Sequence, residues 1–464
     1  MKIRLSILFF FLVAGFVFQG CEDNDDIALP TSLQINDFIW KGLNINYLWQ
    51  ADVSNLADNR FPNQGQYTSF LSNYTPEDLF NVLRIDKSID RFSWIVSDYT
   101  VLEQALQGTT KNNGIEFGLS YKPGSQTEII GYVRYIIPGS DAATKNIKRG
   151  DIFYAVNNVS LTISNYSSLL YSAAENYSLS FADFDGTNFI PNGKVIDFTK
   201  TVLNENPIFI NKIINSGSHK IGYLMYNGFY SNYDVQLNNA FGFLKSEGIT
   251  DLVLDLRYNG GGSVLTATRL ASMITGQFTN QVFTKLTYNK KKSANNVNYL
   301  FPSKISATEI NSLNLSKIYI LTTQSTASAS ELIINGLSPY INVIQIGDVT
   351  YGKNVASVTL YDSSNFSSSN RNPDHKYAMQ PIVAKSVNKN GFGEYEKGLV
   401  PNHSLKESLR TLGVLGDASE PLLSTAIGKI TGTSRWVKQT TENGAIDLVN
   451  DSKTLSGRNE LHIE

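Results

Sequence analysis

Three short runs in the second half of the sequence contain residue types that can carry out acyl transfer. Ser325–Glu331 reads STASASE and leads into a predicted helix, Thr350–Lys353 reads TYGK, and Arg257–Gly262 reads RYNGGG after an apolar stretch. Small residues permit a sharp strand-to-helix turn with a hydroxyl at its apex, and the helix N-terminus adds partial positive charge nearby. A serine there can act as a nucleophile if a base accompanies it. Taken alone, however, a Ser/Thr-rich run before a helix is an N-cap.

The lysine and the glycines can supply the remaining parts of such a site. Lys353 is predicted to follow a buried strand, where loss of water disfavours the ammonium form, so its neutral amine can accept a proton from a hydroxyl. Three consecutive glycines let the backbone turn its N–H groups toward a ligand, as an oxyanion hole requires. A phosphate-binding loop is disfavoured because the Lys and Ser/Thr of a Walker-type loop are missing. A surface lysine and a tight turn remain the plain alternatives for each feature alone.

Together these runs resemble the C-terminal processing, or tail-specific, serine peptidases. The resemblance covers roughly residues 35–425 and rests on four stretches: Leu254–Gly262, Ser325–Glu331, Thr350–Lys353 and Gly398–Asn402. It implies that Ser328, three residues before Glu331, is the nucleophile and that Lys353 is its general base. Both residues keep the family's spacing from the same glutamate, which is more specific than either motif alone.

The same resemblance implies the other parts of the site. The backbone N–H groups of Gly262 and Ala329 would hold the oxyanion, with Gly261 as a near alternative. Many members carry a Gln four residues after the lysine, which helps to orient it. Ser357 stands at that position here, and its hydroxyl reaches less far. The orientation of the base is therefore the weakest part of the match.

Histidine and metal chemistry are not indicated. A related branch, which includes the tricorn peptidases, uses a histidine from an earlier region, but Phe92 stands at that position in this chain. All four histidines lie later in the sequence, at His219, His375, His403 and His462. No HExxH or comparable cluster is present, which argues against a metallopeptidase. We expect no metal and no cofactor.

The length and patterning predict a multidomain α+β protein. Residues 32–110 read mostly as an N-terminal helical domain, and residues 205–428 alternate strands with helices, as in an α/β domain with right-handed crossovers. The resemblance implies that residues 205–428 form a peptidase core of the ClpP/crotonase-like type. Residues 429–464 are polar and weakly patterned, and we expect a small appendage or a flexible tail.

Residues 111–204 read as short strands broken by Gly and Pro, in an order that resembles a PDZ domain. Asn157–Asn158 stands where many such domains have Asn-Gly, a small departure because Asn also tolerates left-handed geometry. PDZ domains bind the carboxylate of a C-terminal peptide with backbone N–H groups. The resemblance places this peptide-binding loop at Gly114, Ile115, Phe117 and Gly118.

The first residues resemble a bacterial lipoprotein signal. Residues 1–20 combine a short basic start with an apolar run too short to span a bilayer comfortably, directly before Cys21, the only cysteine. The resemblance implies that Cys21 is lipidated. The acidic tether at 21–31 is similar to the export signal of surface lipoproteins in the Bacteroidetes group, with ordinary signal cleavage and a simple spacer as alternatives. We expect a lipid-anchored protein of the cell envelope, on the periplasmic or surface face of the outer membrane.

The composition is compatible with these expectations. A hydrophobic content of 42% and a charged content of 17% are ordinary for a globular protein, and a net charge of -2 gives no reason to expect nucleic acid. We therefore expect a serine endopeptidase whose substrates are proteins or peptides with accessible C-terminal tails, presented by the PDZ domain. The alternative is a catalytically inactive, lipid-tethered binding or scaffold protein that retains the peptidase fold.

Overall fold

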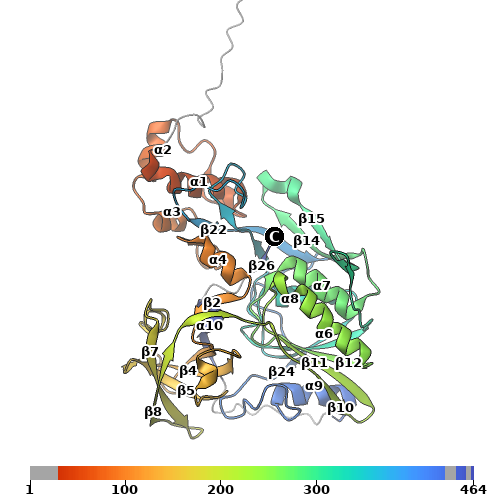
Figure 1. Cartoon of the computed structure of the whole chain (residues 1–464). Helices are drawn as coiled ribbons and strands as arrows, with labels where there is room; N and C mark the ends of the chain where they lie inside the picture. The colour runs from red at the N-terminus through yellow and green to blue at the C-terminus, as the bar shows by residue number, and fades with distance from the viewer. Residues whose placement is uncertain (1–29, 434–445, 456–460, 464) are drawn as a thin grey trace, which may run out of the picture.

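The computed structural model describes residues 30–433, 446–455 and 461–463, so the predictions for residues 1–29, Cys21 included, lie outside it. Figure 1 shows three groups of elements, with N-terminal helices at the top, a mainly β unit at the lower left and an α/β unit at the lower right. Within the described residues, no helix combines the length and the apolar character needed to cross a membrane.

The N-terminal group contains the helices α1 (Gln34–Asn46), α2 (Gln64–Leu71) and α3 (Pro76–Val82). The start of α3 follows from its sequence: Thr75 Oγ1 accepts the N–H of Asp78 at 3.2 Å, and a proline occupies the first turn, where its missing N–H has no cost. The predicted helical character of this region is therefore correct for its first half.

Strands also occur within residues 32–110, and they tie this region to distant parts of the chain. β1 (Trp94–Val96) pairs antiparallel with β22 (Ala378–Gln380). After α4 (Tyr99–Leu106), β2 (Thr109–Asn112) pairs antiparallel with β9 (Thr201–Asn204). The prediction of a helical N-terminal domain therefore needs correction. Residues 32–110 contribute two strands, β1 and β2, to sheets with later parts of the chain.

The middle unit is a twisted antiparallel sheet with two short helices. Asn157 and Asn158 have φ values of 48° and 63°, the left-handed geometry expected of them, at the turn between β5 (Ile152–Val156) and β6 (Val159–Ser160). The short helices are η5 (Ala142–Thr144) and α5 (Tyr166–Leu170). The strands of this unit are β3 (Ile115–Tyr121), β4 (Ile129–Ile136), β5 (Ile152–Val156), β6 (Val159–Ser160), β7 (Asn176–Phe184) and β8 (Phe189–Thr199).

The α/β unit has the alternation that the sequence predicts. Its sheet has the order β10-β11-β12-β18-β19-β24, and only the β10·β11 pair is antiparallel. The strands are β10 (Ile208–Ser216), β11 (His219–Tyr226), β12 (Asp251–Asp255), β18 (Lys317–Thr322), β19 (Asn342–Gly347) and β24 (His403–Ser404). The helices are α6 (Asp234–Ser246), α7 (Val264–Thr275), α8 (Ala329–Leu337) and α9 (Pro421–Thr431).

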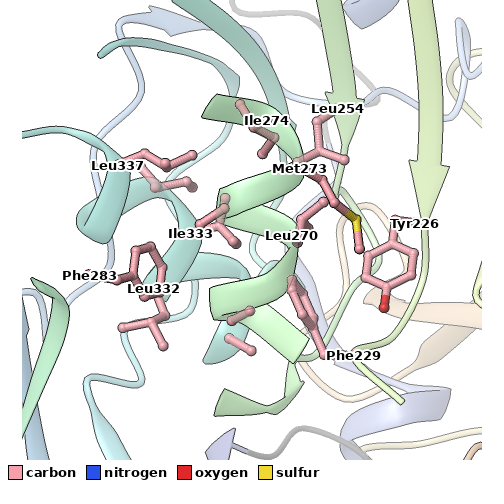
Figure 2. Close-up of a cluster of buried hydrophobic side chains, with 14 of the residues drawn as sticks. Tyr226, Phe229, Leu254, Leu270, Met273, Ile274, Phe283, Leu332, Ile333 and Leu337 are labelled. Atoms are coloured by element: carbon pink, nitrogen blue, oxygen red, sulfur yellow. The ribbon is translucent and has the colours of Figure 1, made fainter. Parts of the chain in front are cut away.

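The largest apolar core lies between this sheet and its helices. Figure 2 shows Leu270 and Met273 of α7 beside Ile333 of α8, with Leu254 of β12 above Met273 in the view. These side chains are fully buried, and each contributes about 1.5–3 kcal/mol of hydrophobic stabilisation. This packing fixes the start of α8 relative to the end of β12.

A second sheet, not foreseen from the sequence, completes the α/β unit. Its order is β13-β26-β20-β23-β14-β15. β13 (Gly262–Ser263), β20 (Val355–Ser357) and β26 (Leu461–His462) form one half, and β14 (Val282–Tyr288), β15 (Val297–Leu300) and β23 (Ile382–Asn388) form the other. Because β26 comes from the end of the sequence, residues predicted to be an appended tail are part of a sheet.

Candidate active site

Ser328 lies at the turn between β18 and α8. Its φ and ψ are 65° and −116°, a combination that a non-glycine residue rarely adopts and that costs on the order of 1–3 kcal/mol. The residue is fully buried, and within the described part of the chain its Oγ has no hydrogen-bond partner. Ser328 is also the N-cap residue of α8 and forms a capping box with Glu331. A left-handed φ at a fully buried serine goes beyond what a cap requires and is typical of a functional residue.

Glu331 connects the predicted nucleophile to the predicted base. Its Oε2 accepts the backbone N–H groups of both Ser328 and Lys353, each at 2.8 Å. Its Oε1 accepts the Gly352 N–H at 2.7 Å and the Thr350 hydroxyl at 2.5 Å. Burial raises the pKa of this carboxyl, and these four donors oppose the rise by stabilising the carboxylate. One buried group therefore holds both backbones within a few ångströms of each other.

Lys353 is fully buried on the loop that follows β19. The preceding Gly352 has a φ of 87°, and a Cβ there would lie 2.3 Å from the backbone oxygen of Glu396, so the loop can turn here only with glycine. The Lys353 Nζ lies 5.0 Å from the centroid of the Phe92 ring. The residue that replaces the histidine of the related branch thus forms an apolar wall against the lysine.

The N-terminal region holds Phe92 in place through Asp90. This buried carboxylate accepts the N–H groups of Phe92 and Ser93 at 3.1 and 2.9 Å, and the Tyr47 hydroxyl at 2.7 Å. Arg91 donates to the backbone oxygen of Gly352 at 2.8 Å. Sequence reasoning missed this role, although an Asp followed two and three residues later by its own N–H donors is a readable turn signal.

The glycine run is attached directly to the nucleophile turn. The backbone oxygen of Asn259 accepts the Ala327 N–H at 3.1 Å and the Ser330 hydroxyl at 3.0 Å. The Asn259 side chain donates to the Tyr226 oxygen at 2.8 Å and accepts the Gly261 N–H at 2.9 Å. The candidate oxyanion loop and the candidate nucleophile are therefore parts of one hydrogen-bonded unit.

Gly262 occupies a position in the run that a residue with a side chain could not take without a clash. Its φ is 137°, and a Cβ would lie 2.3 Å from the Phe229 oxygen. The flanking backbone is bonded to the same residue, with Phe229 N–H donating to Gly261 and Ser263 N–H donating to Phe229 at 2.8 and 2.9 Å. In register, Gly262 pairs with Leu461 of β26.

A buried charge cluster supports the run from behind. Arg257 is fully buried and donates to Asp255 at 2.9 Å, to both oxygens of Glu420 at 2.7 and 2.9 Å, and to Glu407 at 3.1 Å. Burial alone would raise the pKa of Glu407, but the charges of Arg149 and Arg257 outweigh it and lower the pKa to about 2. The cluster fixes the end of β12, from which the glycine run begins.

Ser357 lies in β20, two strands from the glycine run. Its Oγ donates to the backbone oxygen of Leu461 and accepts from Gln380 Nε2, both at 3.1 Å. Gln380 comes from β22 and its Oε1 accepts the Thr359 hydroxyl at 2.7 Å. A glutamine is thus present beside the predicted support position, but it arrives from a strand that sequence spacing could not identify.

The predicted peptide-binding residues divide into two pairs. Ile115 and Phe117 of β3 line a cavity of about 260 Å³ that also has Leu170 of α5 on its wall. Gly114 and Gly118 do not line it; Gly118 instead lies against the Tyr132 side chain. The cavity between β3 and α5 also contains Lys111 and Lys200.

The histidines and the Gly398–Asn402 stretch make contacts of other kinds. His219 and His375 lie 2.8 and 2.9 Å from the carboxylates of Asp251 and Asp362. Among the residues that the structure describes, no three His, Cys, Asp or Glu side chains gather as a metal site would require. The Gly398–Asn402 stretch supports the lysine loop, because its Leu399 N–H donates to Thr350 Oγ1 at 2.7 Å.

Comparison with known proteins finds two family matches in this chain. Residues 220–371 match Peptidase family S41, and residues 34–94 match the Peptidase S41 N-terminal domain. A C-terminal processing peptidase of the chloroplast from Tetradesmus obliquus is 22% identical over 58% of this chain and 57% of its own length. A carboxyl-terminal-processing protease from Picosynechococcus is 25% identical over 34% of this chain and 35% of its own. The chain thus spans less than two thirds of these relatives.

Solved structures extend the likeness to most of the chain. A protein from Bacteroides fragilis whose name assigns it to the S41 proteases has a TM-score of 0.67 and 26% identity, over 86% of this chain and 98% of its own. The photosystem II D1 C-terminal processing protease, with a TM-score of 0.50 and 18% identity, covers 85% of this chain and 100% of its own, and shows the shared fold. The two family matches therefore lie in the order N-terminal domain, then peptidase domain, along the part of the chain that these structures cover.

Proposed function

We propose that this chain is a serine endopeptidase of the C-terminal processing type, which hydrolyses peptide bonds with a Ser328–Lys353 dyad. The observation that carries the proposal is the Glu331 Oε2 atom, which accepts the backbone N–H of both residues. A shared acceptor fixes the nucleophile relative to its base, as a proton transfer between them requires. The matched S41 domain and the names of the relatives support the same reaction.

In the proposed reaction, the neutral amine of Lys353 accepts the Ser328 proton while Oγ attacks a peptide carbonyl. The tetrahedral intermediate then collapses, and Lys353 gives the proton to the leaving amine. Water attacks the resulting ester, Lys353 takes a proton from this water, and Ser328 leaves with that proton. The burial of both residues supports this scheme. Proton transfer between fixed groups has a lower barrier where water does not have to reorganise.

The oxyanion donors in this scheme are the N–H groups of Gly262 and Ala329. Ala329 opens α8, and the first N–H groups of a helix have no partner within the helix. Gly261 is less suitable than the sequence suggested, since its N–H is donated to Asn259 at 2.9 Å. The bonds between Asn259 and the nucleophile turn support Gly262 as the second donor.

For substrate presentation, we propose that the middle unit acts as a PDZ domain. The cavity between β3 and α5 lies where such a domain holds the last side chain of its ligand, and Ile115, Phe117 and Leu170 form an apolar part of its lining. Lys111 and Lys200 also line the cavity, together with Glu175, the ion-pair partner of Lys111. Proteins with accessible C-terminal tails are therefore the proposed substrates.

We also propose that Cys21 carries a lipid that anchors the protein to the outer membrane. The basic start, the apolar run and the acidic residues after Cys21 support this. A metabolic fatty-acid label should enter the wild-type protein and not a Cys21→Ser variant, which should also leave the membrane fraction. Equal labelling of both proteins would contradict the anchor.

The dyad is tested with an acylating serine-peptidase probe and with unstructured proteins of defined C-termini. Ser328→Ala and Lys353→Ala should abolish labelling and lower turnover by at least about 1000-fold. Ser303→Ala and Lys290→Ala, at exposed positions, should retain both. If wild type and both dyad variants labelled equally and cleaved nothing, the chain would be a binding or scaffold protein with this fold.

A further inference from the structure

The last described segments of the chain lie where a peptide substrate would have to bind. β25 (Leu448–Asp451) adds an edge strand to β3 in the middle unit, next to α10 (Ser452–Leu455), and β26 lies between β13 and β20. Figure 1 shows β26 at the centre of the view and α10 beside the middle unit. One stretch of chain thus reaches both the proposed presenting domain and the proposed catalytic site.

β25 pairs with β3 in the direction that a PDZ ligand takes. Leu448 stands opposite Ser120 and Asp451 opposite Gly118, so the segment runs antiparallel to β3 and toward the loop at Gly114. Addition of a strand to this edge through main-chain hydrogen bonds is how such domains bind peptides. A C-terminal ligand would end at the loop, whereas this segment continues past it.

Buried polar contacts hold the segment in this position. Asp451 forms an ion pair with Arg134 at 3.0 Å and accepts the Ser325 hydroxyl at 2.5 Å, and the three residues are 1%, 3% and 4% exposed. Ser452 Oγ accepts the Phe117 N–H at 3.1 Å. Because Ser325 begins the run that contains the nucleophile, the segment is bonded to both the middle unit and the catalytic turn.

β26 occupies the strand position beside the proposed oxyanion loop. Leu461 pairs in parallel with Gly262, and His462 pairs in parallel with Ser263 and Ser357. The Ile463 N–H donates to Ser357 O at 3.0 Å. Leu461 is fully buried. A substrate backbone that reached Gly262 would need the same edge of β13, so both cannot bind at once.

We call the edge of β3 and the edge of β13 together the peptide-binding track. We infer that residues 446–455 and 461–463 are an internal ligand of this track and hold the protein in an autoinhibited state. Occupancy of the track follows from the pairing itself, whereas its effect on turnover rests on the proposed function. An attached ligand acts at an effective concentration of about millimolar. An external peptide must compete with it, which raises the KM and leaves the kcat of the bound complex almost unchanged.

The first test measures binding and needs no catalysis. In a Ser328→Ala background, a fluorescent peptide of residues 446–463 is titrated into the full chain and into a chain that ends at residue 445. We expect saturable binding to the shortened chain and at least 10-fold weaker binding to the full chain. The same peptide with Leu461→Asp should bind weakly to both. Equal affinity of the first peptide for the two chains, or no binding to either, would overturn the inference.

A full-length variant covers the case in which the shortened chain does not fold. Leu461→Asp places a charge in a fully buried position of β26 and should free the track, so the fluorescent peptide should bind this variant at least 10-fold more tightly than the unmodified chain. Asp447→Ala, at an exposed position of the same segment, is the matched control and should bind like the unmodified chain.

Hydrolysis of an unstructured protein then separates this inference from the proposed function. With Ser328 intact, the shortened chain or Leu461→Asp should show a KM at least 10-fold lower than the full chain, with kcat within about 2-fold. Hydrolysis with equal KM values would overturn the autoinhibition and leave the peptidase intact. The peptide could instead bind the shortened chain more tightly than the full chain while no form hydrolyses the substrate. That result would overturn the proposed peptidase activity and leave the internal-ligand inference intact.

Discussion

Two of the four donors to Glu331 are the backbone N–H groups of Ser328 and Lys353. A carboxylate can serve all four because each of its oxygens accepts more than one hydrogen bond. A glutamine has the same shape but only one acceptor oxygen. Its NH2 group would face two of the donors and could not accept their hydrogen bonds. Position 331 therefore tests whether the dyad depends on charge or only on shape.

The Glu331→Gln variant should lower the free energy of unfolding by about 3 kcal/mol, because at least one buried donor loses a charged acceptor. Labelling of Ser328 by the acylating probe should fall with it. Urea unfolding and labelling rates check both effects. Glu309→Gln, which changes an exposed ion pair to Lys304, should stay within about 1 kcal/mol of the wild type. A Glu331→Gln protein with unchanged stability would show that the contacts do not need the carboxylate.

Glu407 predicts how stability depends on pH. Its pKa lies at about 2 in the folded protein against an ordinary 4.5, so its ionised form stabilises the fold above about pH 4.5. This contribution, about 3 kcal/mol, is lost as the pH falls from 4.5 toward 2. Glu407→Gln should therefore be less stable at pH 7 and show a flatter decline on acidification. Parallel pH profiles of the two proteins, measured by urea unfolding, would contradict this.

At the scale of elements, the glycine run is a short connection under strong constraint. It leaves β12 beside the Arg257 cluster, touches the nucleophile turn through Asn259, and joins β13 at Gly262. Each contact limits a different part of the run. Changes along it should therefore alter catalysis before they alter the fold as a whole.

Gly262→Ala should destabilise the protein by about 2 kcal/mol more than Gly391→Ala, because its added Cβ would meet the Phe229 oxygen. Gly391 is the matched control, since its φ is also positive, at 89°, but nothing lies within 4 Å of its Cβ position. Probe labelling should be lost only in Gly262→Ala. Equal effects of the two changes, measured by thermal unfolding, would mean that the close approach at Gly262 is unimportant.

Asn259→Ala should lower kcat about 10- to 100-fold and change KM little, because the loop that presents Gly262 loses both side-chain bonds. Asn259→Asp keeps an acceptor for the Gly261 N–H and should recover part of the activity. Steady-state kinetics on an unstructured protein distinguish the two. If the aspartate variant were as poor as the alanine variant, the bond to Gly261 would not be the relevant one.

At the scale of the whole molecule, the N-terminal region completes the core instead of standing apart from it. Met379 of β22 is fully buried in the same apolar cluster as Phe38 of α1, and Ile382 donates its N–H to Ser93 Oγ at 2.9 Å. A chain lacking residues 30–93 should therefore expose Met379 and fail to fold cooperatively. Circular dichroism on heating checks this, and a sharp two-state transition in the shortened chain would contradict it.

The sequence predicts the parts of this protein that depend on local patterns. The helix predicted after the Ser328 run forms as α8, and the buried strand predicted before Lys353 forms as β19. Gln380 and Phe92 could not be assigned in the same way, because β-pairing across hundreds of residues brings them to the site. The same limit explains residues 446–455 and 461–463, which belong to a stretch that reads as a polar tail and whose partners lie in other segments.

Under the proposed function, the position of β26 would also limit the shape of the substrates that the site can cleave. Neighbouring strands in a sheet lie about 4.8 Å apart, so β13 and β20 stand roughly 10 Å apart on either side of it. A slot of this width accepts one extended backbone and excludes a helix with its side chains, which measures about 10–12 Å across. A folded protein can therefore enter only by first opening a segment, and its local unfolding free energy becomes part of its cleavage rate. Selection between targets would then depend on how easily their ends unravel as much as on their sequence.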